Sequence, residues 1–225
     1  MLVIQELLIK RLFFCSVMMF MSMNVVAGNI YHQFPDEVHP DDKYVFYSHG
    51  FIVEGTNERP KHKVWGVYDF PAVKAALKDD SYHLLAYHRP AKTNPNIYAK
   101  QLAQEVNTLI EQGVAPENIT ILGFSRGGAI SIATSNALAS DKVKTIILAG
   151  CAGAIAKNPE IHVYGKVYSI YETSDQVGSC QYVIDRSKDV VSFEELAIST
   201  GKSHGAFYRP IAEWVEPVKK WIKSQ

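Results

Sequence analysis

The sequence predicts an α/β fold in which one mostly parallel sheet of about six strands is covered by helices on both faces. Short apolar runs alternate along the chain with segments in which apolar residues recur at helical spacing. The connections between them are short, and no repeat, linker or low-complexity segment interrupts the alternation. Strands that alternate with helices in this way are typical of parallel sheets that are buried on both sides.

Length and composition agree with one domain of this class. The 225 residues are enough for a hydrophobic core, and 47% apolar against 20% charged residues excludes a disordered chain. The 23 basic side chains balance the 23 acidic ones, so the formal net charge is zero. Proteins that bind nucleic acid normally carry a basic surface, and we therefore expect no nucleic-acid partner.

The N-terminal segment is predicted to be a targeting signal. All five methionines fall within the first 23 residues, where Lys10 and Arg11 precede the apolar run 12–23 and the short residues VVA follow it. This order predicts a secretory signal peptide over residues 1–27 and a single domain over residues 28–225. The protein would then be exported, periplasmic or secreted, without a stable membrane anchor after cleavage. A retained anchor is the alternative, although the run is short for a span of about 20 residues.

Six apolar runs are predicted strands, because they are short and bounded by glycine or polar residues. In chain order they are residues 44–48, 84–87, 119–122, 144–148, 163–171 and 193–199. After the predicted cleavage only residues 28–43 precede the first of these strands, which leaves little room for an additional antiparallel hairpin. In parallel sheets of this kind, ligands bind at the carboxyl ends of the strands.

Four segments between and after these strands show helical spacing of apolar residues. They are residues 68–78, 97–112, 126–139 and 211–222. Pro71 lies near the start of the first helix, where a missing N–H is harmless, and Gly113 ends the second. Pro217 is expected to interrupt the last helix.

The motif GFSRG at residues 123–127 lies directly after one predicted strand and directly before a predicted helix. A turn this sharp crowds the neighbours of Ser125, so it requires glycine on both sides and exposes the hydroxyl at the edge of the sheet. The helix N-terminus adds a positive dipole end beside that hydroxyl. The bare pattern also arises by chance, and it is the position between strand and helix that predicts a nucleophilic serine.

On this motif and its context, residues 44–225 resemble the α/β-hydrolase superfamily of serine hydrolases. In that superfamily the nucleophile, an acid and a histidine occur in this order, each at the carboxyl end of its own strand. The resemblance implies Asp175 as the acid, because it follows the second strand after the motif, with Glu172 as its competitor. It implies His204 as the base, because this residue lies between the last strand and the last helix.

The resemblance also implies the activity. A serine hydrolase of this kind cleaves carboxylic esters, or thioesters, through a Ser-His-Asp triad and an acyl-enzyme intermediate. His204 would accept the proton of Ser125, and Asp175 would hold the imidazole in the required tautomer. We expect no cofactor and no metal, because His39, Asp41 and Asp42 lack a usable ligand spacing.

Two backbone N–H groups are expected to bind the oxyanion. In the superfamily one belongs to the residue after the nucleophile, here Arg126, and the other to the loop after the first core strand, where the His-Gly pair points to Phe51. His49 would order that loop and would not act as a second base. Arg89, at the end of another strand, is expected either to meet an anionic group of the substrate or to form a structural salt bridge.

Two segments bear on whether anything covers the active site, as a cap domain does in larger members of the superfamily. Only a short segment separates the predicted strands 144–148 and 163–171, where lidded members insert a helical cap, so we expect no cap domain. The polar loop 54–63 is expected to be either a partial rim of the site or simply a solvated loop.

Cys151 and Cys180 are the cysteines that remain after the predicted cleavage. Two cysteines in an exported protein are a natural pair, and two buried free thiols are the alternative. The topology of the superfamily makes the strands before these cysteines neighbours. The resemblance therefore implies a disulfide that braces the loop of the catalytic acid.

Two other functions stay open at this point. A peptidase or amidase would use the same triad, and a non-catalytic binding module would keep the fold with an inactive site. The ester would be a small molecule or borne on a polymer, and neither its identity nor the oligomeric state follows from the sequence.

Overall fold

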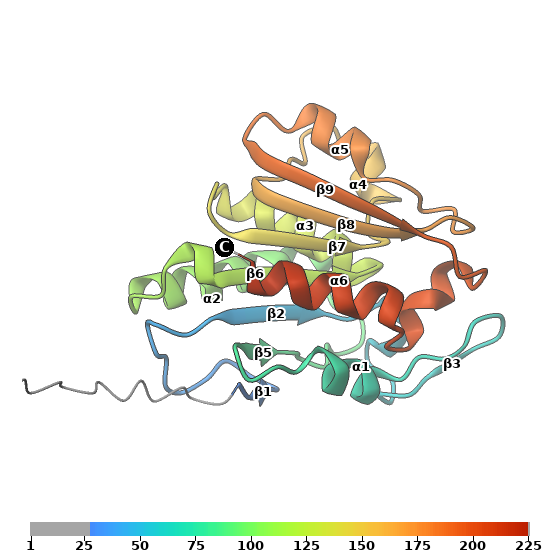
Figure 1. The fold of residues 1–225 in the computed structure, drawn as a ribbon, viewed down its shortest axis with the longest axis horizontal. Coiled ribbons are helices and arrows are strands. Elements are labelled where there is room, and N and C mark those ends of the chain that lie inside the picture. The colour runs from blue at the N-terminus through green and yellow to red at the C-terminus, as the bar shows by residue number, and fades with distance from the viewer. Residues whose placement is uncertain (1–27, 225) are drawn as a thin grey trace, which may run out of the picture.

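The computed structural model describes residues 28–224, so the predicted signal peptide lies outside the described residues. The chain forms the predicted parallel sheet, with seven strands where six were expected (Figure 1). The strand order is β1-β5-β2-β6-β7-β8-β9, and every neighbouring pair is parallel. The strands are β1 (Ile30–Tyr31), β2 (Tyr44–Ser48), β5 (His83–Leu85), β6 (Ile119–Phe124), β7 (Lys144–Leu148), β8 (Gly165–Glu172) and β9 (Val190–Ile198).

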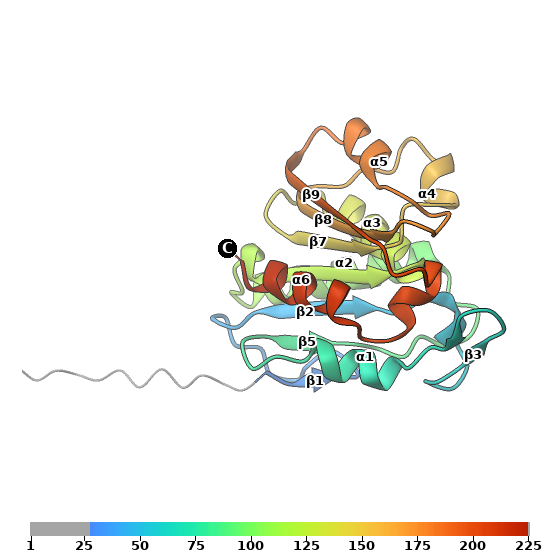
Figure 2. The same ribbon diagram turned by 45° about the vertical axis from the view of Figure 1, so that its right-hand side comes forward.

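Helices cover both faces of the sheet because its strands are apolar on both sides. Figures 1 and 2 show α1 (Phe70–Leu77) and α6 (Ala212–Lys223) in front of the sheet, with α2 (Pro95–Glu111) and α3 (Arg126–Leu138) behind it. The short helices α4 (Ala154–Lys157) and α5 (Gln181–Arg186) pack on the same side as α3. The buried apolar residues accordingly form one cluster on the α1 and α6 face and two on the other.

The ends of the long helices follow from local chemistry. The Asp69 side chain accepts a hydrogen bond from an N–H of the first turn of α1, and Asn94 does the same for α2. Gly113, with φ of +96°, follows the end of α2. Contrary to the prediction, α6 continues through Pro217 without interruption. The buried Lys144 side chain donates to carbonyl oxygens of Trp221 and Ile222 at the end of this helix.

The elements that the sequence pattern missed are short. β1 adds the seventh strand by pairing Ile30 with Leu84 of β5. Within and after the polar loop 54–63, β3 (Lys61–His62) and β4 (Gly66–Val67) form an antiparallel hairpin. Three 3₁₀ helices also occur, η1 (Phe51–Val53), η2 (Pro116–Asn118) and η3 (Ser203–Tyr208). Elements of two to six residues are too short to show a periodicity, so only the tertiary structure reveals them.

Within residues 28–224, no cap domain covers the carboxyl ends of the strands, in agreement with the prediction. The connection from β7 to β8 contains only the four-residue helix α4. The hairpin β3–β4 projects beyond this end of the sheet (Figures 1 and 2). None of the helices within residues 28–224 combines the length and the apolar character that a membrane span requires.

Candidate active site

Ser125 occupies a strained turn between β6 and α3. Its φ of 56° and ψ of −117° belong to a region that side-chain-bearing residues rarely adopt, at a cost of about 1–3 kcal/mol. Its N–H donates to the carbonyl of Leu148 at 2.8 Å, which ties the turn to β7. A Cβ on Gly123 would lie 2.2 Å from the oxygen of Gly127, and one on Gly127 would lie 1.9 Å from the oxygen of Ser48. Both glycines of the motif are therefore required by packing.

The fold brings Ser125, His204 and Asp175 into one hydrogen-bonded line. His204 lies in η3, directly after β9, and its Nε2 is 2.8 Å from Oγ of Ser125. Its Nδ1 is 2.5 Å from Oδ2 of Asp175, which follows β8. Because a carboxylate only accepts hydrogen bonds, Nδ1 carries the proton and Nε2 is free to accept one from the serine hydroxyl. A hydroxyl, an imidazole and a carboxylate thus stand in one hydrogen-bonded sequence, which is the geometry that nucleophilic catalysis requires.

Aromatic side chains fix the His204 ring. Its centroid lies 4.9 Å from that of Phe124 and 5.2 Å from that of Trp65. Trp65 belongs to the turn between β3 and β4 and stacks on His62 at 4.2 Å. A Cβ on Gly205 would lie 2.7 Å from Cβ of Trp65, so glycine is needed beside the histidine. Sequence reasoning missed Trp65, because nothing local connects the hairpin to a loop so distant in the chain.

Glu172, the competing acid, is bonded to other groups than His204 and braces the site instead. Its side chain is fully buried at the end of β8. Both carboxylate oxygens accept hydrogen bonds, and the donors are the N–H and hydroxyl of Ser174, the N–H and hydroxyl of Thr200 and the N–H of Gly201. Burial alone would raise the pKa of Glu172, but these hydrogen bonds lower it to about 2. The carboxylate therefore joins the loop of Asp175 to the loop of His204.

The predicted disulfide is present between Cys151 and Cys180, whose Cα atoms are 5.2 Å apart. Cys151 follows β7, and Cys180 immediately precedes α5. The N–H of Cys180 donates to the carboxylate of Glu195 on β9 at 2.8 Å. The bridge thus ties the loop after β7 to the segment that follows Asp175.

The predicted oxyanion donors, Phe51 and Arg126, are neighbours in space. The guanidinium carbon of Arg126 lies 4.9 Å from the centroid of the Phe51 ring, which is 61% exposed. Phe51 begins η1 and Arg126 begins α3, and first-turn N–H groups have no partner within their own helix. Within residues 28–224, neither backbone N–H donates a hydrogen bond. Both groups are therefore free to bind a ligand oxygen.

His49 is locked in a neutral form beneath this loop. The backbone N–H of Arg89 donates to its Nε2 at 3.0 Å, so Nδ1 carries the proton and donates to the carbonyl of Gly50 at 2.8 Å. Burial, and then the charge of Arg89, lower the pKa of His49 to about 2. With both ring nitrogens engaged, His49 orders the loop and has no free nitrogen to act as a base.

The structure decides between the two expectations for Arg89 and changes the interpretation of Glu54. Arg89 is 1% exposed and lies 3.7 Å from Glu54, which favours the structural salt bridge over contact with substrate. Glu54 itself, placed by the sequence in a polar loop, is buried. No local pattern could have found it, because its basic neighbours Arg89 and Arg126 follow strands much later in the chain.

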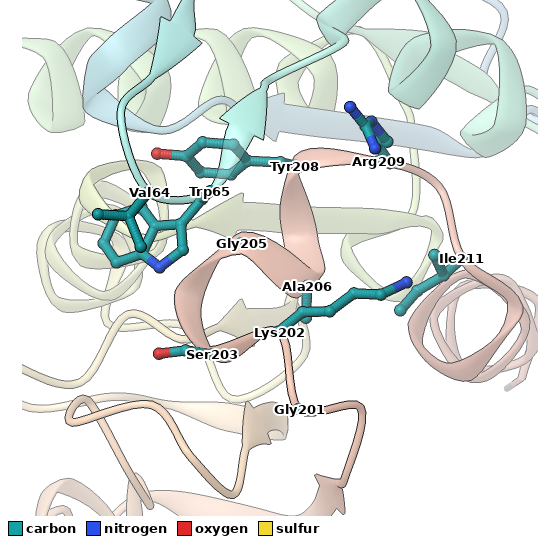
Figure 3. Close-up of a pocket in the computed structure, with 10 residues that line it drawn as sticks. All are labelled: Val64, Trp65, Gly201, Lys202, Ser203, Gly205, Ala206, Tyr208, Arg209 and Ile211. Carbon is teal, nitrogen blue, oxygen red and sulfur yellow. The ribbon is translucent and has the colours of Figure 1, made fainter.

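A pocket of about 410 Å³ lies against the loop that carries His204 (Figure 3). Val64 and Trp65 of the hairpin form one side, and the rest of the lining consists of Gly201, Lys202, Ser203, Gly205, Ala206, Tyr208, Arg209 and Ile211. Lys202 and Arg209 bring two positive charges to the lining, which contains no acidic residue. Neither cation takes part in an ion pair within the described part of the chain.

Comparison with known proteins supports the fold and the reaction class. Residues 89–204 match the model of a family described as phospholipase/carboxylesterase. The structure of SOBER1 from Arabidopsis thaliana is similar, with 12% sequence identity, a TM-score of 0.53, and coverage of 81% of this chain and 98% of that one. A CIB-like hydrolase from Thermoplasma acidophilum is 17% identical, with a TM-score of 0.53 and coverage of 82% and 88%.

A structure described as an arylesterase is also similar, with 10% identity, a TM-score of 0.53 and coverage of 84% and 78%. No curated protein matches the sequence significantly. At these identities the structural likeness shows the fold alone, whereas the family match spans slightly more than half of the chain. The chain is a carboxylesterase-type hydrolase with the α/β-hydrolase fold, and it belongs to the phospholipase/carboxylesterase family.

Proposed function

We propose that this protein is a serine carboxylesterase in which Ser125 is the nucleophile, His204 the general base and Asp175 the acid. The observation that carries the proposal is the line of hydrogen bonds, 2.8 Å from Ser125 to His204 and 2.5 Å from His204 to Asp175. Nε2 of His204 takes the hydroxyl proton while Oγ of Ser125 attacks the ester carbonyl carbon. The same proton then goes to the departing alcohol, and an acyl-enzyme remains.

Deacylation repeats these steps with water as the nucleophile. His204 removes a proton from the water, a second tetrahedral oxyanion forms, and Ser125 recovers its proton as the acid leaves. In both halves the oxyanion accepts hydrogen bonds from the N–H groups of Phe51 and Arg126. Donors of this kind are each worth about 3–4 kcal/mol of transition-state stabilisation.

The remainder of the substrate is proposed to occupy the pocket between the hairpin and the His204 loop. Trp65 both lines this pocket and lies beside the His204 ring. Without a cap the site is open, which suits small esters and esters carried on a polymer. The positive lining of Lys202 and Arg209 favours substrates with an anionic group.

We also propose that the protein acts outside the cytoplasm. Structural disulfides persist in oxidising compartments, and Cys151–Cys180 is such a bridge. The bridge supports the same location that the N-terminal segment predicts.

A fluorophosphonate probe and p-nitrophenyl esters of graded chain length test the proposed reaction together. The wild-type protein should be labelled once and should hydrolyse the esters, and Ser125→Ala should lose both, with a fall in kcat of about 10⁴-fold or more. Ser192→Ala, which removes an exposed hydroxyl on β9, is the matched control and should behave as wild type. An aminoacyl p-nitroanilide tests the amidase alternative. Unlabelled wild-type protein, or labelling that survives Ser125→Ala, would refute the assignment.

A further inference from the structure

Three charged side chains form a cluster directly behind the proposed oxyanion hole. Glu54 follows η1, Arg89 follows β5 and Arg126 begins α3. Oε2 of Glu54 lies 3.3 Å from Nε of Arg126 and 3.7 Å from Nε of Arg89. Its other oxygen accepts a hydrogen bond from the N–H of Thr93 at 3.0 Å. The side chains of Glu54 and Arg89 are 1% and 0% exposed, so two of the three charges are withdrawn from water.

This cluster is attached to both halves of the oxyanion hole. Nη2 of Arg89 donates to the carbonyl oxygen of His49 at 2.5 Å, and its backbone N–H donates to the His49 ring at 3.0 Å. These two hydrogen bonds from Arg89 hold the start of the segment from His49 to Phe51 in place. On the other side, the Arg126 guanidinium packs against the ring of Phe51. Glu54 is the member that touches both arginines, and it joins the two halves.

Hydrogen bonding within the cluster is incomplete. Oε2 of Glu54 and the Nε atoms of Arg89 and Arg126 meet as ion pairs without a well-aligned hydrogen bond, and Nη1 of Arg89 has no hydrogen-bond partner within residues 28–224. Buried charges that are imperfectly bonded contribute little to stability, and they destabilise a protein when one partner is removed. Their concentration beside Ser125 therefore indicates a role in the reaction more than in folding.

The charge of the cluster agrees with such a role. Two guanidinium groups and one carboxylate leave a net positive charge behind the place where the transition state becomes negative. Fixed charges and dipoles that are already oriented before the reaction stabilise such a transition state without reorganisation. Without the carboxylate, the two guanidinium groups would repel each other across the gap that Glu54 now fills.

We propose that Glu54 is a positioning residue, which holds Arg126 and Arg89 so that the N–H groups of Arg126 and Phe51 stay aligned on the oxyanion. The inference rests on the proposed esterase function. Glu54 touches no reacting atom, and it acts through the two arginines. Its loss should therefore weaken binding of the transition state much more than binding of the ester.

Glu54→Gln in the full chain tests this, with kcat and KM measured on p-nitrophenyl butyrate. A trifluoromethyl ketone, which forms a tetrahedral oxyanion on the serine, reports the oxyanion hole directly. We expect kcat to fall about 10- to 100-fold, KM to stay within about twofold, and affinity for the ketone to fall by the same factor as kcat/KM. Fluorophosphonate titration of active sites corrects for any misfolded fraction.

Arg126→Gln is the second variant, because its side chain is 32% exposed and its loss leaves Glu54 paired with Arg89. We again expect kcat to fall while KM changes little. Arg126→Lys, which keeps the charge, should retain more activity than Arg126→Gln. Lys142→Gln breaks an exposed ion pair with Glu117 and is the control, with unchanged kinetics. Unchanged kcat per active site in the Glu54 and Arg126 variants, or a loss of melting temperature alone, would overturn the inference and leave the esterase proposal standing. A wild-type protein without esterase activity would overturn both.

Discussion

Replacing Glu172 by glutamine is expected to destabilise the junction between the two loops that carry Asp175 and His204. The carboxylate is fully buried and accepts bonds from two groups of donors, one on each oxygen. An amide supplies an acceptor to only one group, and its NH₂ must face the N–H groups of the other. A buried donor left without an acceptor costs about 1–3 kcal/mol.

The pKa of Glu172 leads to a similar magnitude. Its hydrogen bonds outweigh burial and lower the pKa from 4.5 to about 2, which corresponds to about 3 kcal/mol of stabilisation of the ionised form in the folded state. This contribution is fully present above pH 4.5, the value of the unfolded chain, and it is lost as the pH falls toward 2. The variant should therefore be about 2–3 kcal/mol less stable than wild type at pH 7, and the difference should shrink with acidification.

Urea unfolding followed by tryptophan fluorescence at pH 7, 5, 4 and 3 measures this difference. Glu111→Gln is the matched control, because Glu111 is an exposed glutamate at the end of α2 and should show no difference at any pH. The reasoning is refuted if Glu172→Gln is as stable as wild type at pH 7. It is equally refuted if a stability difference persists unchanged down to pH 3.

Three further predictions concern the site and its surroundings. Asp175→Asn should lower kcat about 10⁴-fold without unfolding the protein, because an amide no longer selects the required tautomer of the base; steady-state kinetics beside circular dichroism check this. Replacing Cys151 and Cys180 by serine should lower the free energy of unfolding by about 3–4 kcal/mol, measured by urea denaturation with and without reductant. Lys202→Gln combined with Arg209→Gln should raise KM for mono-p-nitrophenyl succinate about fivefold and leave p-nitrophenyl butyrate unchanged, because about 1 kcal/mol of attraction for the carboxylate is lost.

Each of these predictions has an outcome that contradicts it. An Asp175→Asn variant with near wild-type kcat would assign the orienting role to another group. A serine pair as stable as the oxidised wild type would show that the bridge contributes nothing. Equal KM changes for the charged and the neutral ester would exclude an electrostatic role for the pocket.

Local sequence patterns predicted the long elements and the turn at Ser125, whereas Asp175 and His204 were implied by the resemblance to a known superfamily. Strands 44–48 and 144–148 have the predicted bounds, because apolar runs between polar residues have few other ways to be buried. The two glycines of GFSRG identified the turn at Ser125, because only residues without a Cβ fit at positions 123 and 127. The disulfide of Cys151 with Cys180 followed from the resemblance to a known topology.

The tertiary structure decided which distant groups meet. The sequence left Asp175 and Glu172 as competitors, and the structure places Asp175 against His204 while the Glu172 carboxylate receives backbone N–H groups from a loop beyond β9. The buried Glu54 and the contact of Trp65 with His204 left no local signal either.

A sequence pattern reports what each segment needs from its immediate surroundings, such as an apolar neighbour, a cap or a residue without a side chain. It therefore determined the sheet, the helices and the turn at Ser125. Charge pairing and ring contacts depend on distances between segments far apart in the chain, and those distances exist only once the sheet has brought the strand ends together. For that reason the cluster around Glu54, the brace at Glu172 and the pocket beside His204 were decided by the tertiary structure alone.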